Sequence, residues 1–243
     1  MEIDKIYNMD CLEGMKQIPD GSIDAIICDL PYGTTRNSWD SVIPLDKLWE
    51  QYKRIAKPNA AICLFAQTPF DKVLGCSNLE WLKYEWIWEK EMGTGFLNAK
   101  YVPMKNHENI LVFYQEHPTY NPQMRKGEPY KCKKGSASTN YANKNTDVVT
   151  ISNGERYPLT ILRFDRDRDA FHPTQKPVDL LRYLVKTYSN EGDTILDNCM
   201  GSGTTAVACI KEKRHFIGFE LNKEYYDKAC QRIDAVKRQL TLF

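Results

Sequence analysis

Short apolar runs that alternate with amphipathic stretches constrain the fold of this chain more than any other feature. Residues 23–28 and 60–65 are almost continuously apolar, which is typical of strands buried on both faces of a parallel sheet. Between them, residues 45–56 carry apolar side chains at helical spacing, and the alternation returns after Pro177. This order predicts an α/β fold with a doubly wound, mostly parallel sheet.

The same patterns predict the positions of the individual elements. We expect helices to begin at Pro177 and after Asn222, which caps the last one. The other predicted helices are 12–18, 45–56, 69–76 and 204–211, and the predicted strands are 3–6, 23–28, 60–65, 84–88, 109–114, 194–197 and 216–220.

The middle of the chain differs in composition from both ends. Residues 115–170 are rich in Asn, Thr, Pro, Gly and Lys and show little periodicity, which predicts an inserted region or a binding loop. We therefore expect one domain built from two halves, 1–114 and 171–238, followed by a tail, 239–243. The whole chain carries 33 Lys and Arg against 32 Asp and Glu, so any basic surface must be local.

The eight cysteines lie mostly in apolar runs and form no Cys-x-x-Cys pair. This favours buried, reduced thiols over a disulfide or zinc framework and predicts a reducing cytoplasm, with no metal site. No run approaches about 18 apolar residues, so we expect neither a membrane span nor a signal peptide.

A glycine turn near the C-terminus joins a predicted strand to a helix. In Asp197–Thr205 the glycines allow a ligand to approach the backbone, and the helix presents free N–H groups. Glu220 ends the next strand, where a carboxylate can accept hydrogen bonds from ribose hydroxyls. The string from Gly201 to Ala206 also fits a dinucleotide fingerprint, but its late position and Asp197 favour S-adenosylmethionine (SAM), which carries a sulfonium and an ammonium.

A second motif, Asp29-Leu30-Pro31-Tyr32, directly follows a predicted buried strand. The Asp29 carboxylate can accept a hydrogen bond from an amino group, and Pro31 fixes the backbone so that the Leu30 carbonyl can be a second acceptor. Tyr32 offers a face for stacking on a base. The alternative is a strand-end turn in which Asp29 caps backbone N–H groups and Tyr32 packs.

Together the two motifs resemble those of the DNA amino-methyltransferases that modify adenine N6 or cytosine N4. The order of tetrad, basic insert and glycine turn resembles the beta class, as do residues 88–90, 107–111 and 171–177. The resemblance covers about residues 5–235, apart from the insert. Leu30 replaces a usual proline, and Cys199-Met200 replaces a commoner apolar pair.

The resemblance implies a Rossmann-like, SAM-dependent methyltransferase fold with a permuted motif order. It implies transfer of a methyl group from SAM to a flipped adenine in duplex DNA, with the base amine held by Asp29 and the Leu30 carbonyl. Asp at the head of the tetrad favours adenine N6 over cytosine N4, and no Pro-Cys pair supports cytosine C5 chemistry. Methylation of RNA or of a protein amide, and a catalytically silent DNA-binding protein, remain as alternatives.

The resemblance also implies a set of cofactor contacts around this tetrad. Asp10 would meet the adenine ring of SAM, Glu220 its ribose, and the glycine turn its methionine portion. The full implied set is Asp10, Cys11, Asp29, Thr174, Gln175, Lys176, Asp197, Cys199, Gly201, Ser202, Gly203, Thr204, Thr205, Glu220 and Asn222.

The basic insert is the predicted region for DNA recognition. Between Gln123 and Asn145 six basic residues stand against one acid, with tyrosines between them. Lysine and arginine would neutralise phosphates and asparagines would read base edges; a solvated loop is the alternative. The predicted contacts are Arg125, Lys126, Lys131, Lys133, Lys134, Asn140 and Lys144.

The last five residues resemble the tail by which bacterial replication proteins dock on the sliding clamp. Gln239, Leu240, Leu242 and Phe243 carry the resemblance. The alternative is that these apolar side chains cover the protein's own core. Similar proteins often form homodimers, and the family implies a bacterial or bacteriophage enzyme of a restriction-modification system at the nucleoid.

Overall fold

The computed structural model describes residues 1–33, 41–133, 149–168 and 174–240. It contains two compact units. The first combines Met1–Asn121 with Thr160–Phe243, and the second is Pro122–Leu159. Each unit is described separately below.

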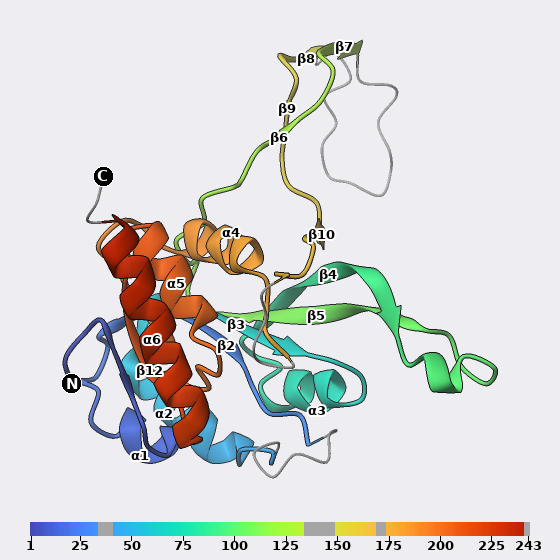
Figure 1. The fold of residues 1–243 in the computed structure, drawn as a ribbon. Helices are drawn as coiled ribbons and strands as arrows, with labels where there is room; N and C mark the ends of the chain where they lie inside the picture. The colour runs from blue at the N-terminus through green and yellow to red at the C-terminus, as the bar shows by residue number, and fades with distance from the viewer. Residues whose placement is uncertain (34–40, 134–148, 169–173, 241–243) are drawn as a thin grey trace. The chain divides into compact units, whose positions relative to one another are not determined.

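An eight-stranded sheet organises the first unit (Figure 1). The strands from β1 to β3 in the sheet order are parallel, β5 is antiparallel to both β3 and β4, and β10 is parallel to β4. This confirms the predicted mostly parallel, Rossmann-like α/β fold. The order is β1 (Lys5–Tyr7), β12 (His215–Phe219), β11 (Thr194–Asp197), β2 (Ile23–Asp29), β3 (Ala56–Ala66), β5 (Lys105–Phe113), β4 (Leu82–Thr94) and β10 (Ile161–Arg163).

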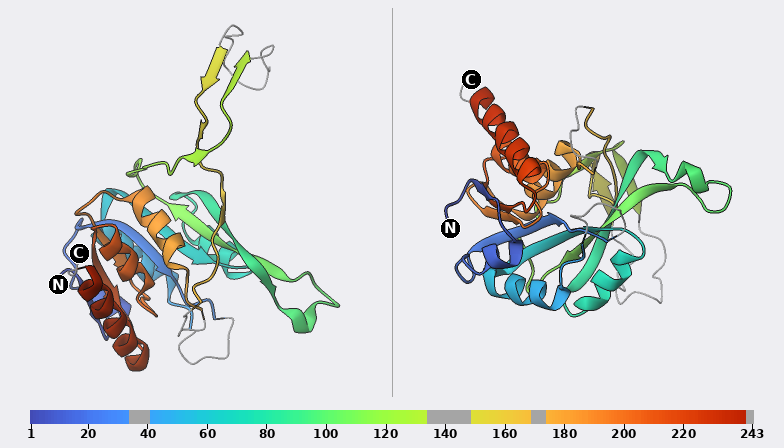
Figure 2. Two further views of the ribbon diagram at one scale, coloured as in Figure 1. Left: turned by 45° about the horizontal axis from the view of Figure 1, so that its top comes forward. Right: turned by 60° about the horizontal axis from the view of Figure 1, so that its bottom comes forward.

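Helices cover both faces of this sheet, as Figure 2 shows. One face packs against α1 (Cys11–Met15), α2 (Leu45–Ile55) and α3 (Phe70–Ser77), and the other against α4 (Val178–Tyr188), α5 (Thr204–Lys211) and α6 (Lys223–Leu240). In β2, Ala25 and Ile27 belong to the core under α4–α6, whereas Ile26 and Cys28 belong to the core under α1–α3. Burial on both faces is the reason that this strand is continuously apolar.

The helix starts follow the signals in the sequence. Asp10 caps α1, because its Oδ1 accepts hydrogen bonds from the Leu12 and Glu13 amides at 2.9 and 3.1 Å. Pro177 directly precedes α4. Asn222 caps α6, as predicted, since its Oδ1 accepts from the amides of the second and third residues after it.

Two antiparallel strands are longer than predicted. The pair β4 and β5 continues beyond the sheet as a two-stranded ribbon (Figure 1), with the short 3-10 helix η1 (Phe96–Asn98) at its tip. The paired backbones satisfy each other's hydrogen bonds without a buried face, so no apolar pattern marks this ribbon in the sequence. The tip instead exposes six large apolar side chains: Met92, Phe96, Leu97, Tyr101, Val102 and Met104.

The second unit consists of two short antiparallel strand pairs. β6 (Arg125–Lys126) pairs with β9 (Glu155–Arg156), and β7 (Tyr130–Lys133) pairs with β8 (Val149–Ser152). The unit is narrower than the predicted insert, 115–170, because 161–163 form β10 and pair with β4. Lys134, Asn140 and Lys144 lie outside the described residues.

All eight cysteines are free thiols, but they are not uniformly buried. Cys11, Cys28, Cys63 and Cys209 are buried, whereas Cys76 and Cys132 are exposed, contrary to the prediction. Cys132 lies on β7, whose two-stranded ribbon has no core to cover it. Within the described ranges, no helix has the length and apolar character needed to cross a membrane.

Candidate active site

The carboxyl ends of the central strands border a cavity of about 250 Å³. β2 and β11 are neighbours in the sheet, and the strands that follow them along the chain, β3 and β12, lie on opposite sides of this pair. Such a switch point leaves a crevice at the strand ends, where ligands of open α/β sheets bind. The arrangement brings the tetrad after β2 and the glycine turn after β11 to one cavity.

Most residues predicted for the site line this cavity. Gly203 and Asn222 do not. Gly203 has φ +75° and precedes α5, and a Cβ there would lie 3.2 Å from the Ala229 Cβ, so the position serves helix packing. Asn222 uses its side chain to cap α6. The predicted residues that line the cavity are Asp10, Cys11, Asp29, Leu30, Pro31, Tyr32, Thr174, Gln175, Lys176, Asp197, Cys199, Gly201, Ser202, Thr204, Thr205 and Glu220.

Asp197 is a buried carboxylate with a fixed orientation. It ends β11, and its oxygens accept hydrogen bonds from the Cys199 amide at 3.1 Å and the Thr205 hydroxyl at 2.6 Å. Burial raises the pKa of Asp197 to about 6, although both hydrogen bonds oppose this change. At neutral pH the group is therefore an anion in a poorly hydrated position, which a cationic ligand would stabilise.

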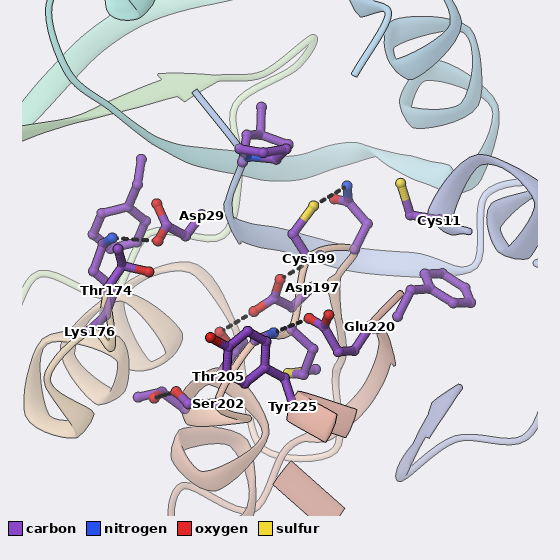
Figure 3. A pocket seen from close by; sticks show the side chains of 18 of the residues that line it. Cys11, Asp29, Thr174, Lys176, Asp197, Cys199, Ser202, Thr205, Glu220 and Tyr225 are labelled. Carbon is purple, nitrogen blue, oxygen red and sulfur yellow. Dashed lines mark hydrogen bonds and ion pairs between the residues drawn. The ribbon is translucent and has the colours of Figure 1, made fainter. Parts of the chain in front are cut away.

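Glu220 is held by the backbone beside the glycine turn. Its two carboxylate oxygens accept hydrogen bonds from the Gly201 and Asn222 amides, each at 2.8 Å. Burial raises its pKa. An ionised carboxylate has about four acceptor positions, so each Glu220 oxygen can still accept a further hydrogen bond. In Figure 3, Glu220 and Asp29 lie toward opposite ends of the cavity, with Asp197 between them.

Asp29 contacts side chains from two parts of the chain. Its Oδ1 accepts a hydrogen bond from the Tyr32 hydroxyl at 2.6 Å, and its Oδ2 accepts one from the Lys176 ammonium. The Tyr32 ring stacks on Phe70, with 5.4 Å between ring centroids. Burial raises the pKa of Asp29, against the opposing charge of Lys176. Both of these hydrogen bonds come from side chains.

Lys176 also lies close to a second carboxylate, that of Glu108 on β5. The Lys176 Nζ is 3.2 Å from Glu108 Oε2, and Glu108 pairs in turn with Lys90 on β4. The resemblance implies a cofactor contact for Lys176, and in the structure Lys176 lines the cavity with Asp29 of the tetrad as its closest partner. The two residues that precede Lys176 differ from it in their surroundings. Thr174 is exposed, and the Gln175 side-chain amide donates a hydrogen bond to Asp167 at 3.2 Å.

Glu108 is the main lining residue that the sequence reasoning missed. It lies near the beginning of β5, and only an antiparallel strand brings its beginning to the edge where the parallel strands end. Nothing in the sequence around Glu108 marks the antiparallel direction of β5. Other lining residues not predicted are Met9, Ile27, Ser41, Ile43, Phe65, Gln67, Leu181, Asn198, Met200, Phe219, Leu221 and Tyr225.

Of these, Asn198 is held in place by a hydrogen bond from helix α2. It is buried, and its side-chain oxygen accepts a hydrogen bond from Tyr52 of α2 at 2.5 Å. This bond ties the glycine turn to the helix layer on the other side of the sheet. Across the described ranges, no three His, Cys, Asp or Glu side chains are grouped so that they could hold a metal ion.

Comparison with known proteins identifies the family. A family model described as DNA methylase, of the N6/N4 class, matches residues 23–231. The chain is 30% identical to the DNA adenine methyltransferase YhdJ of Escherichia coli K12, covering 96% of this chain and 83% of YhdJ. It is 28% identical to the type II methyltransferase M1.MboII of Moraxella bovis, over 94% and 96% of the two chains.

The fold has solved counterparts. The structure titled M1.HpyAVI-SAM complex superposes with a TM-score of 0.65 at 24% identity, over 94% of this chain and 98% of that one. The family match spans the tetrad, the insert and the glycine turn. The chain therefore belongs to the N6/N4 family of DNA methylases.

Proposed function

We propose that this protein transfers a methyl group from SAM to the N6 amine of adenine in duplex DNA. The observation that carries the proposal is that Asp29 and Gly201, far apart in the sequence, border one cavity. Family membership supports DNA as the substrate and an exocyclic amine as the acceptor. The residue roles below are our assignments.

The lining residues suit SAM as the methyl donor. Asp197 and Glu220 are oriented carboxylates beside a glycine turn, and SAM carries an ammonium, a sulfonium and ribose hydroxyls. We assign Asp197 to the methionine portion, Glu220 to the ribose, and Asp10 and Cys11 to the adenine end. When bound, SAM supplies an electrophilic methyl group on its sulfonium sulfur.

The tetrad suits capture of a base amine. The target nitrogen is hidden inside a duplex, so the base must flip out of the stack to reach the cavity. Asp29 and the Leu30 carbonyl would accept its two amine hydrogens, and Tyr32 would stack on the ring. This geometry aims the nitrogen lone pair toward the SAM end of the cavity, and positioning of this kind lowers the barrier without a covalent intermediate.

Adenine is the favoured base. Asp at the head of the tetrad supports it, and so does the name of the relative YhdJ, a DNA adenine methyltransferase. Cytosine N4 is the alternative, because cytosine presents the same amine beside an acceptor ring nitrogen. RNA, a protein amide and a catalytically silent DNA-binding protein are less supported, given the DNA methylase match.

We assign DNA recognition to the second unit. Its predicted phosphate contacts that the structure describes, Arg125, Lys126, Lys131 and Lys133, are all exposed. Lys131 and Lys133 are two residues apart on β7 and therefore share one face of the ribbon. Such side chains are free to neutralise phosphates.

Two partner proteins are also proposed. Leu240, near the end of α6, is 51% exposed, which supports docking of the tail on a sliding clamp over packing on the protein's own core. Gln239 precedes it, whereas Leu242 and Phe243 lie outside the described residues. The apolar tip of the β4–β5 ribbon supports a homodimer, because monomers seldom expose such a patch. The name of the relative M1.MboII, a type II methyltransferase, supports a restriction-modification role. The location at the bacterial nucleoid is proposed because the substrate is DNA.

The test is single-molecule sequencing of plasmid DNA from a bacterial host that lacks its own DNA methylation. We expect N6-methyladenine at one short recurring sequence with the native protein, and none with Asp29→Ala. N4-methylcytosine would favour the alternative base. No modified base, with SAM binding intact, would contradict the proposal.

A further inference from the structure

We propose that Lys176, held in place by Glu108, is a positioning residue that keeps the Asp29 carboxylate ionised and oriented to accept the target amine. Neither is assigned to touch the base. This inference rests on the proposed function, because it concerns how Asp29 performs its part in amine capture.

Four charges of alternating sign form a line from the cavity toward the β4–β5 ribbon. Asp29 contacts Lys176, Lys176 lies 3.2 Å from Glu108, and Glu108 contacts Lys90. The side chains of Lys176, Glu108 and Lys90 are only 8%, 10% and 13% exposed, whereas Asp29 keeps 25%. Of the two carboxylates in this line, Asp29 is therefore the one with more room to meet a ligand. Figure 3 shows its contact with Lys176.

Each inner charge depends on its neighbours to remain a charge. Burial would lower the pKa of Lys176, but the two carboxylates raise it above its ordinary value. Burial would raise the pKa of Glu108, but Lys176 and Lys90 hold it below its ordinary value. Lys176 is therefore held in its charged form.

Glu108 has a feature that hydrogen bonding in the described structure does not explain. Its Oε2 is buried without a hydrogen-bond partner of good geometry, although the Lys176 ammonium lies near it. A buried carboxylate oxygen without a hydrogen-bond partner lowers the stability of the folded protein. We interpret it as the consequence of placing Glu108 where its charge holds the Lys176 ammonium beside Asp29, the closer of the two carboxylates.

Charged and titratable groups face Asp29 from every element packed against it. Lys176, before α4, favours its ionised form, and so does the hydrogen bond from Tyr32. Glu108 of β5 and Asp197 of β11 disfavour it as like charges, and burial disfavours it further. Lys176 is the only full positive charge among these contacts of the described residues, so the ionised state depends on it.

Ionisation matters because a carboxylate only accepts hydrogen bonds, whereas a carboxylic acid also donates. The amine must find an acceptor on Asp29. Tyr32 and Lys176 occupy two of about four acceptor positions, which leaves room for the amine without displacing either. Without Glu108, Lys176 would lose its second anchor, so the orientation of Asp29 toward the amine would be less well fixed.

The pair therefore makes two predictions of opposite sign for the acid limb of the rate–pH profile. Lys176→Met removes the charge that favours ionisation, so the limb should move to higher pH, with about a tenfold or greater loss of kcat at pH 6 relative to pH 8. Glu108→Gln removes a like charge, so the limb should move to lower pH while the plateau kcat falls. Lys176→Arg keeps the charge and should restore a limb near that of the native protein.

The experiment measures kcat and KM for transfer of tritiated methyl groups to plasmid DNA from pH 5.5 to 9, with SAM affinity measured by calorimetry. The matched control is Glu212→Gln. Glu212 is a similarly buried carboxylate, 13% exposed, paired with Arg182 away from the cavity, and its loss should leave the limb unmoved. Circular dichroism and thermal unfolding check that each variant folds.

The outcomes separate this inference from the proposed function. If the native protein methylates no DNA, the proposed function fails. If it methylates DNA but both variants move the acid limb in the same direction, or leave it in place, the positioning role is overturned. Loss of SAM affinity that parallels the loss of kcat would make Lys176 a SAM contact and overturn it as well. A variant that does not fold is replaced by Lys176→Gln or Glu108→Met.

Discussion

Replacing Asp197 with Asn should stabilise the ligand-free protein at neutral pH. Asp197 is 4% exposed, and burial raises its pKa from an ordinary value of 3.8 to about 6. Because the pKa of Asp197 is higher in the folded state, the folded protein binds this proton more tightly than the unfolded chain does. The folded protein therefore loses stability as the pH rises from about 4 toward 6 and beyond, where Asp197 ionises. Asn can keep both hydrogen bonds, since the Thr205 hydroxyl can turn to accept from the amide.

The magnitude follows from the size of the pKa change. A difference of about two units, at about 1.4 kcal/mol each, corresponds to about 3 kcal/mol at pH 8. At pH 5 Asp197 is largely ionised in the unfolded chain but largely protonated in the folded protein. About half of the 3 kcal/mol is therefore present at this pH. The stability advantage of Asp197→Asn should therefore grow by about 1 to 2 kcal/mol between pH 5 and pH 8.

Urea unfolding of the ligand-free protein at several pH values measures this difference. Calorimetry on the same samples should show that Asp197→Asn binds SAM much more weakly, because the cationic ligand loses its anion. A stability difference that does not change with pH would refute the electrostatic reasoning. So would unimpaired SAM binding by the more stable variant.

Three further predictions address the other parts of the molecule. Asp29→Ala should abolish methylation but retain SAM binding, in filter-binding and calorimetric assays, and joint loss of both would remove Asp29 from the role of amine acceptor. Lys131→Gln and Lys133→Gln should each weaken DNA binding and reduce the slope of log affinity against log salt by about one, measured by fluorescence anisotropy; an unchanged slope would exclude them as phosphate contacts. Deletion of residues 239–243 should abolish capture by immobilised sliding clamp without changing methylation of plasmid DNA, and undiminished capture would refute docking through the tail.

The fold was predictable wherever burial leaves a pattern in the sequence. β2, β3, β11 and α5 lie within a few residues of their predicted positions, because continuous apolar runs and glycine punctuation mark them. The predicted strands 84–88 and 109–114 are shorter than β4 and β5, because the outer part of this ribbon is held by paired backbones rather than by a buried apolar face. β10 was missed because three residues at the edge of a sheet carry no recognisable period.

The candidate site was predictable where it depends on local chemistry. Asp29, Asp197 and Glu220 end strands at one edge of the sheet, and that placement follows from parallel topology alone. The partnership of Lys176 with Glu108 does not follow from it, because it depends on the antiparallel direction of β5 and on the path of the chain before α4. Long-range charge pairs of this kind leave no spacing in the sequence.

The central claim is that one cavity brings together a methyl donor beside Asp197 and a base amine beside Asp29. The most direct measurement uses purified protein, duplex DNA and SAM labelled in its methyl group, followed by digestion to nucleosides and mass spectrometry. The account predicts labelled N6-methyldeoxyadenosine with the native protein, and none with either Asp29→Ala or Asp197→Ala. Label on a ring carbon, or transfer that survives either substitution, would contradict it.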